Sequence, residues 1–142
     1  MSAKRLSSYL NENLVDETLA LELATRAGVE HKGTRLGTFL ELLSWSLEDD
    51  RDVLEALMRK VRVRRKGVGL ILARIADVMG RRPLSTVAEL ESLDRHINGK
   101  LDMWIALRSV VGDRVDGIDF DEMVDRAEGQ ARVVLTKLAA AS

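Results

Sequence analysis

The stretch from Thr34 to Val61 constrains the fold of this chain more than any other. Its large aliphatic residues recur at alternating spacings of four and three, at Leu36, Leu40, Leu43, Leu47, Leu54, Leu57 and Val61. This spacing is typical of a helix that packs along one seam in a bundle. Asp50 occupies one position of the same seam, near the middle of a helix about 40 Å long. The pattern therefore predicts a long bundle helix that carries a carboxylate at mid-height.

Composition limits both the fold class and the environment. A chain of 142 residues with one proline and 4% aromatic residues favours a single all-α domain, residues 1–142, with Trp45 and Trp104 in its core. The net charge of −1 creates no field that would attract nucleic acid or an anionic membrane. The absence of cysteine excludes disulfides and thiolate metal ligands. With no signal peptide or membrane span in the sequence, we expect a cytoplasmic protein.

Helical periodicity extends over most of the chain and sets a topology. The predicted helices are about Lys4–Gly28, Thr34–Val61, Gly67–Met79, Thr86–Val111 and one that opens at Asp119–Phe120. Short connections join the first predicted helix to the second and the fourth to the fifth, so each pair is expected to form an antiparallel hairpin. A crossover of about 25 residues joins the two hairpins and can travel the full length of the bundle. The second and fourth predicted helices should therefore run parallel.

Local sequence signals mark several helix ends. Thr34 is expected to be an N-cap, and Asp119 is expected to cap the last helix. Thr86 and Glu89 have the spacing of a capping box. The segment Arg81–Pro83 is expected to form the turn that ends the crossover.

Three stretches support a resemblance to a known superfamily. They are Leu21-Glu22-Leu23-Ala24, the run from Glu48 to Arg51, and Gly99-Lys100-Leu101 followed by Trp104-Ile105-Ala106-Leu107. With four long helices, one long crossover and mid-helix carboxylates, the chain resembles the ferritin-like superfamily. More narrowly, it is similar to small bacterial ferritin-like proteins without an assigned function. The resemblance implies a ferritin-like four-helix bundle with a short extra helix in the long crossover between the second and third bundle helices.

A carboxylate-bridged metal centre in such a bundle needs a glutamate from each of two helices and a Glu-x-x-His pair from each of the other two. Here Glu48 is followed three residues later by Arg51, and neither Glu91 nor Glu122 has a histidine at that spacing. Arginine is a permanent cation and opposes metal binding. We therefore expect no cofactor, no stoichiometric iron, manganese or zinc, and no ferroxidase activity. The alternative is an iron- or manganese-binding or redox protein with the ligands Glu22, Glu48, Glu91, His96 and Glu122.

In place of metal, the sequence indicates a buried network of charged side chains. Its expected members are Glu22, Asp50, Arg51, Glu91, Asp94 and Lys100. Arg51 is expected to pair with a carboxylate from a neighbouring helix, Glu22 in particular, because a buried carboxylate without a partner is costly. Two alternatives remain open. Glutamate–arginine pairs four residues apart also stabilise solvated helix faces, and Asp50 and Asp94 can serve as polar breaks that set helix register.

These observations favour a non-catalytic protein. We expect a ferritin-like bundle that lacks an intact di-metal site and acts by self-association or by binding another protein. A further alternative is a nucleic-acid or anionic-partner module that uses the basic cluster at residues 59–66. That cluster has no interleaved aromatic residues and no net positive domain behind it, which argues against nucleic acid.

Overall fold

The computed structural model of the chain describes residues 1–80 and 85–142. The side chains of Val68, Leu72, Val78 and Met79 are also outside the description. The helices are α1 (Ala3–Glu30), α2 (Arg35–Lys60), α3 (Val68–Gly80), α4 (Thr86–Val111) and α5 (Phe120–Ala141), with a 3-10 turn, η1 (Gly112–Arg114), after α4. The part of the chain that the structure describes contains no β-strand, so the predicted all-α class is confirmed.

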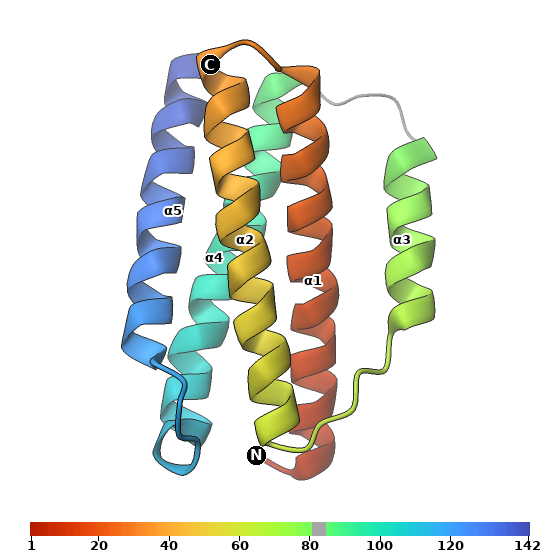
Figure 1. Cartoon of the computed structure of the whole chain (residues 1–142), viewed down its shortest axis with the longest axis vertical. Coiled ribbons are helices and arrows are strands. Elements are labelled where there is room, and N and C mark those ends of the chain that lie inside the picture. The colour runs from red at the N-terminus through yellow and green to blue at the C-terminus, as the bar shows by residue number, and fades with distance from the viewer. Residues whose placement is uncertain (81–84) are drawn as a thin grey trace.

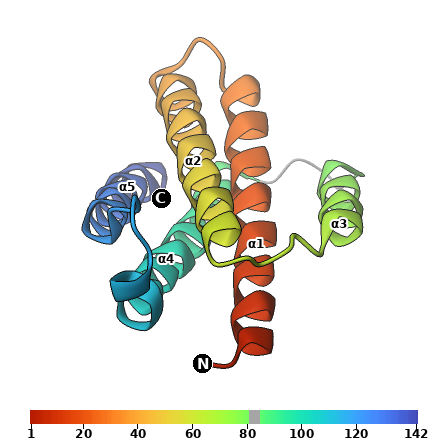
Figure 2. The same ribbon diagram turned by 60° about the horizontal axis from the view of Figure 1, so that its bottom comes forward.

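The four long helices α1, α2, α4 and α5 lie side by side. The shorter helix α3 lies outside this bundle and contacts α1 (Figure 1). Packing is most extensive within the hairpins α1–α2 and α4–α5, and α1 also packs along α4. Following the chain, α1 rises, α2 descends, α3 rises outside the bundle, α4 descends and α5 rises (Figure 1). Figure 2, seen from nearer the lower end, shows α3 outside the other helices. Because α2 and α4 both descend, the prediction that they run parallel is confirmed (Figure 1).

The seam predicted on α2 is the buried face of that helix. Leu40, Leu43, Leu47, Leu54 and Leu57 are all buried, and Asp50 between them is 0% exposed. Two clusters of apolar side chains lie on either side of this level. One is centred on Leu54, Trp104 and Phe120, and the other contains Leu40, Ala24 and Ile97. The polar middle of α2 thus lies between two apolar layers.

The sequence pattern on α4 predicts a seam of Val87, Leu90, Asp94, Ile97, Leu101, Trp104 and Val111. In the structure Leu93 and Lys100 are buried in place of Asp94 and Leu101. The buried face follows Leu90, Leu93, Ile97, Lys100, Trp104, Leu107 and Val111. Asp94, which the sequence analysis placed on the seam, is only half-buried, and its side chain accepts a hydrogen bond from Asn98 Nδ2 at 3.1 Å. The heptad pattern continues equally well through position 93 or 94, and the leucine at 93 has the larger apolar surface to bury. Lys100 therefore lies on the core face.

The helix ends agree with the predicted caps at two of three positions. Thr34 Oγ1 accepts from the backbone N–H of Gly37, and Asp119 Oδ1 accepts from that of Glu122, both at 3.0 Å. The cap of α4 is Ser85 and not Thr86, since Ser85 has the extended backbone that an N-cap requires and accepts from Ala88 N–H. The turn predicted at residues 81–83 lies outside the described residues.

The turn between α1 and α2 is tightly packed. The carbonyl oxygen of His31 accepts hydrogen bonds from the backbone N–H and the hydroxyl of Thr34, at 3.1 and 2.6 Å. A Cβ atom on Gly37 would lie 2.1 Å from that oxygen, so only glycine fits at this position. Gly33 has a φ of 86°, a backbone conformation that favours glycine. This turn therefore holds the end of α1 against the start of α2.

The two tryptophans have different environments. Trp104 is 0% exposed and meets Phe120 edge to face, with ring centroids 6.0 Å apart. Trp45 is 57% exposed on the outer face of α2, so its predicted place in the core is wrong. Within residues 1–80 and 85–142, no helix combines the length and the apolar character needed to span a membrane.

Candidate functional site

A buried ion pair joins α2 to α4 in the middle of the bundle. Asp50 is 0% exposed and Lys100 is 4% exposed. Lys100 Nζ donates to Asp50 Oδ2 and to the side-chain oxygen of Gln130 on α5, both at 2.5 Å. The ammonium group of Lys100 therefore lies between oxygen atoms from two different helices.

Two further donors complete the surroundings of Asp50. The amide nitrogen of Gln130 donates to Asp50 Oδ2 and to Ser46 Oγ, both at 2.8 Å. Arg126 Nη2 lies 2.8 Å from Asp50 Oδ1, an ion pair without the alignment of a hydrogen bond. Asp50 is thus neutralised by two cations and hydrogen-bonded by an amide. We call Glu17, Ser46, Asp50, Lys100, Arg126 and Gln130 the central polar layer.

Glu17 is the contribution of α1 to this layer. It is 7% exposed, and neither of its carboxyl oxygens has a hydrogen-bond partner among the described residues. Burial raises the pKa of Glu17 to about 8, with a smaller upward effect from Asp50, while the cations Lys100 and Arg51 oppose this rise. At neutral pH Glu17 is therefore mainly a neutral carboxylic acid.

Arg51 does not make the predicted contact with Glu22. Its Nε atom lies 3.6 Å from Oε1 of Glu55, one turn further along α2. Successive residues of a helix point about 100° apart, so Arg51 points to one side of the core when Asp50 points into it. Arg51 lines a pocket of about 260 Å³ between α1, α2 and the crossover, together with Asn11, Thr18, Glu55, Arg65 and Lys66.

Three other members of the predicted network lie outside the layer. Glu91 is exposed, while Glu22 and Asp94 are half-buried. None of the three contacts Asp50 or Lys100 among the described residues, so from the predicted set the structure brings together Asp50 and Lys100. Glu91 is misplaced because the buried face of α4 runs through Leu90 and Leu93 instead.

The ligand set of the alternative metal hypothesis is also dispersed. Glu48, Glu91 and Glu122 are exposed, and Glu22 and His96 are half-buried. Burial lowers the pKa of His96, partly offset by Asp16. None of the five belongs to the group of metal-capable side chains that lie close together among the described residues. The middle of the bundle does not fit a di-metal centre, because Lys100 and Arg126 already supply its positive charge.

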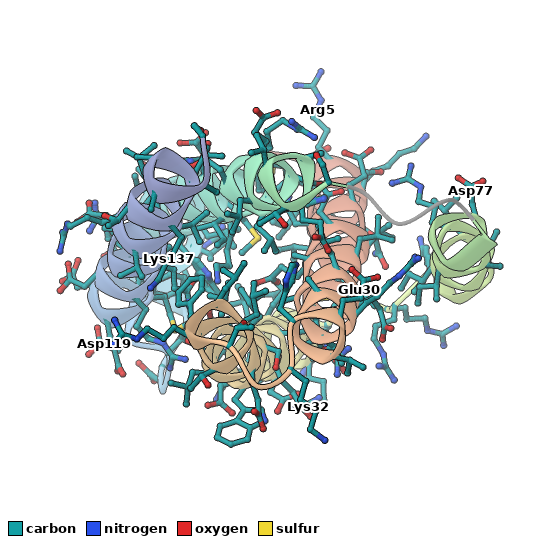
Figure 3. All side chains as sticks on the ribbon, turned by 90° about the horizontal axis from the view of Figure 1, so that it is seen from above. Arg5, Glu30, Lys32, Asp77, Asp119 and Lys137 are labelled. Carbon is teal, nitrogen blue, oxygen red and sulfur yellow. The ribbon has the colours of Figure 1, made fainter. Side chains whose placement is uncertain are left out.

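The close group of metal-capable side chains lies at the upper end of the bundle. Its members are Glu30 and His31 at the end of α1 and Glu89 in the first turn of α4, with one ligand atom of each within 4.8 Å of the others. Figure 3 shows Glu30 at this end of α1. His31 Nε2 lies 3.3 Å from Glu89 Oε1, and Glu89 is 5% exposed. Burial raises the pKa of Glu89, and the hydrogen bond with His31 opposes that rise.

Glu17 and Gln130 are not among the site residues predicted from the sequence, although both carry a detectable signal. Glu17 lies on the apolar stripe of α1, three residues after Leu14. Gln130 continues a four-three spacing from Met123 and Ala127 on α5. The same test that singled out Asp50, a polar residue on an apolar seam, finds both of them.

Comparisons with models of known protein families, with curated proteins and with solved structures find no match to this chain.

Proposed function

We propose that this chain is a non-catalytic, ferritin-like helical bundle whose center is neutralised by its own cations, and that it acts by binding protein. The observation that carries the proposal is the position of the Lys100 ammonium group. It lies between Asp50 and Gln130, at the mid-height where ferritin-like bundles with metal would hold their ions. A side-chain cation at that place supplies permanently the charge that a metal would bring.

Electrostatics support the absence of metal at this level. Two unit charges about 4 Å apart repel by about 4 kcal/mol at the effective dielectric constant of a protein, and a divalent ion doubles this figure. An ion beside Asp50 would face both Lys100 and Arg126. The acid groups are also closed to substrates, because Asp50 is 0% and Glu17 is 7% exposed. A structural role for the layer follows.

The outer face of α2 supports an interaction role. Leu42 is 56% and Trp45 is 57% exposed, and residues three apart on a helix share a face. Tryptophan is enriched among the residues that dominate binding energy at protein interfaces. We propose this face of α2 as the contact surface, with a second copy of the chain as the first partner to test.

Metal analysis of purified variants tests the proposal for the central polar layer. Dialysis against limiting iron or manganese should leave the metal content of Asp50→Asn and Glu17→Gln equal to that of the wild type. Asp94→Asn, a half-buried carboxylate outside the layer, is the matched control. One or two ions per chain that disappear with Asp50→Asn or Glu17→Gln would instead establish a central metal site.

Sedimentation velocity over a range of concentrations tests the contact surface. We expect a concentration-dependent dimer that is lost in Trp45→Ser and retained in Val133→Ser, where the exposed valine lies on α5. Tryptophan fluorescence supplies a second measure of dimer formation, because Trp45 is exposed while Trp104 is buried. A monomer at every concentration would exclude self-association and leave a different protein as the partner.

A further inference from the structure

Three groups at the upper end of the bundle have the composition of a metal site. Glu30, His31 and Glu89 offer two carboxylates and one imidazole within 4.8 Å of one another. They come from the end of α1 and the start of α4, and these two ends lie at the same end of the bundle (Figure 1). We infer that this group binds one divalent transition-metal ion, with zinc as the best-suited ion.

The geometry already approaches that of a bound ion. Zinc binds imidazole nitrogen and carboxylate oxygen at about 2.0–2.2 Å, so two ligands of a tetrahedral ion lie about 3.3 Å apart. His31 Nε2 and Glu89 Oε1 are 3.3 Å apart. The imidazole favours zinc over magnesium or calcium, which prefer oxygen ligands alone. Three protein ligands leave a fourth position open to water.

The charges of the group call for a cation. The carboxyl groups of Glu30 and Glu89 lie within the 4.8 Å that encloses the group, and two carboxylates at such a distance repel each other unless a proton or another cation lies between them. Glu89 is 5% exposed, so solvent cannot screen this repulsion well. Arg26 Nε lies 3.2 Å from Glu30 Oε1, so an ion bound by Glu30 would share this carboxylate with Arg26.

The backbone holds His31 in place before any ion arrives. His31 caps α1 through its N–H, which donates to the carbonyl of Ala27, and its own carbonyl accepts from Thr34. The absence of a side chain at Gly37 lets α2 approach this carbonyl closely. A ligand with a fixed backbone loses little conformational entropy on binding. The α1–α2 turn thus fixes the backbone of His31 in place before an ion binds.

The site would fasten the two hairpins to each other. His31 and Glu30 belong to the α1–α2 hairpin, whereas Glu89 belongs to the α4–α5 hairpin. An ion bound by all three cross-links them at the end opposite the cluster of Trp104 and Phe120. The expected role is structural, and it does not depend on the central polar layer.

Zinc titration by calorimetry, together with zinc content after gel filtration, tests the inference on the full chain. We expect about one zinc ion per chain and a higher thermal midpoint with zinc than without it. The chain has two histidines, which gives a matched pair of variants. His31→Gln should weaken zinc binding by more than about 100-fold, since even second-shell changes cost 10–100-fold. His96→Gln should bind like the wild type.

Further variants keep the test decisive. Glu30→Gln changes an exposed residue and should weaken zinc binding without unfolding the chain, even if His31→Gln does not fold. No zinc binding, or equal binding by wild type, His31→Gln and Glu30→Gln, overturns the inference and leaves the proposed function intact. Zinc lost with Asp50→Asn but kept with His31→Gln overturns both. Zinc lost only with the end-site variants supports both.

Discussion

Asp50 and Glu17 are both buried carboxylates of the central polar layer, but their surroundings differ completely. Asp50 is 0% exposed and contacts Lys100, Arg126 and Gln130. Glu17 is 7% exposed and, within the part of the chain that the structure describes, has no hydrogen-bond partner at either oxygen. Both carboxyl groups have lost their contacts with water, and only Asp50 has gained ion pairs and hydrogen bonds within the protein in exchange.

The comparison shows that partners, and not burial alone, decide what a buried acid does. Asp50 faces the cations Lys100 and Arg126, and its contacts with them and with Gln130 join α2 to α4 and α5. Glu17 is driven toward its neutral form, with a pKa of about 8. The layer therefore contains one carboxylate that has cationic partners and another whose burial favours the neutral form.

The largest expected effect comes from removing the cation that pairs with Asp50. Lys100→Met should lower the free energy of unfolding by about 3–5 kcal/mol, because it leaves a buried carboxylate with less than its full complement of partners. Urea denaturation at pH 7 measures the change. Arg95→Met, an exposed cation on the same helix, is the control and should change stability by less than about 0.5 kcal/mol. A loss below about 1 kcal/mol for Lys100→Met would contradict the assignment.

The second effect is a pH dependence that belongs to Glu17. Its stabilising contribution is fully present below pH 4.5, the ordinary pKa, and is lost as the pH rises to and through the folded value of about 8. At about 1.4 kcal/mol per unit, the loss at pH 7 is roughly 3 kcal/mol. Glu17→Gln should therefore be more stable than the wild type at pH 7 and lose this advantage near pH 4.

Denaturant unfolding at several pH values measures this difference between variant and wild type. Glu12→Gln, an exposed glutamate on the same helix, should show no such trend. If the difference between Glu17→Gln and the wild type is independent of pH, Glu17 is ionised in the folded protein and the contrast with Asp50 fails.

A smaller effect is expected at Gln130, which serves both charged partners. Gln130→Leu removes the acceptor of Lys100 and a donor to Asp50 and Ser46, and should cost about 1–3 kcal/mol. Thermal unfolding compared with Glu128→Leu, an exposed site on the same helix, measures the cost. Equal stability of the two variants would show that the amide is not needed.

The smallest effect is expected at Arg51, which sequence analysis placed in a buried pair. In the structure Arg51 is one quarter exposed and lies 3.6 Å from Glu55. Such partly solvated pairs contribute under about 1 kcal/mol. Arg51→Leu should therefore cost less than about 1 kcal/mol in urea denaturation. A loss of several kcal/mol would instead show that Arg51 belongs to a buried ion pair.

Periodicity predicted the helices and the α2 seam well, because a run of leucines at four-three spacing allows one buried face. It failed on α4, where the series can pass through Leu93 or Asp94 and the choice depends on what α1 and α5 present. The ion pair of Asp50 was expected, but its full set of partners depends on the register between helices. His31 and Glu89 are far apart in sequence, so only the tertiary fold shows that they meet.

The tight α1–α2 turn also sets the level of the central polar layer. From Glu17 to the end of α1 the helix rises about 20 Å, and from the start of α2 down to Asp50 it spans about 22 Å. In the other hairpin, Lys100 and Gln130 lie about 16 and 15 Å from their own turn. Glu17 and Asp50 therefore lie at about the same height, and so do Lys100 and Gln130, because the two residues of each pair are separated from their turn by about the same length of helix. One residue inserted between Gly37 and Asp50 would shift the carboxylate by about 1.5 Å and rotate it by about 100°, out of reach of Lys100.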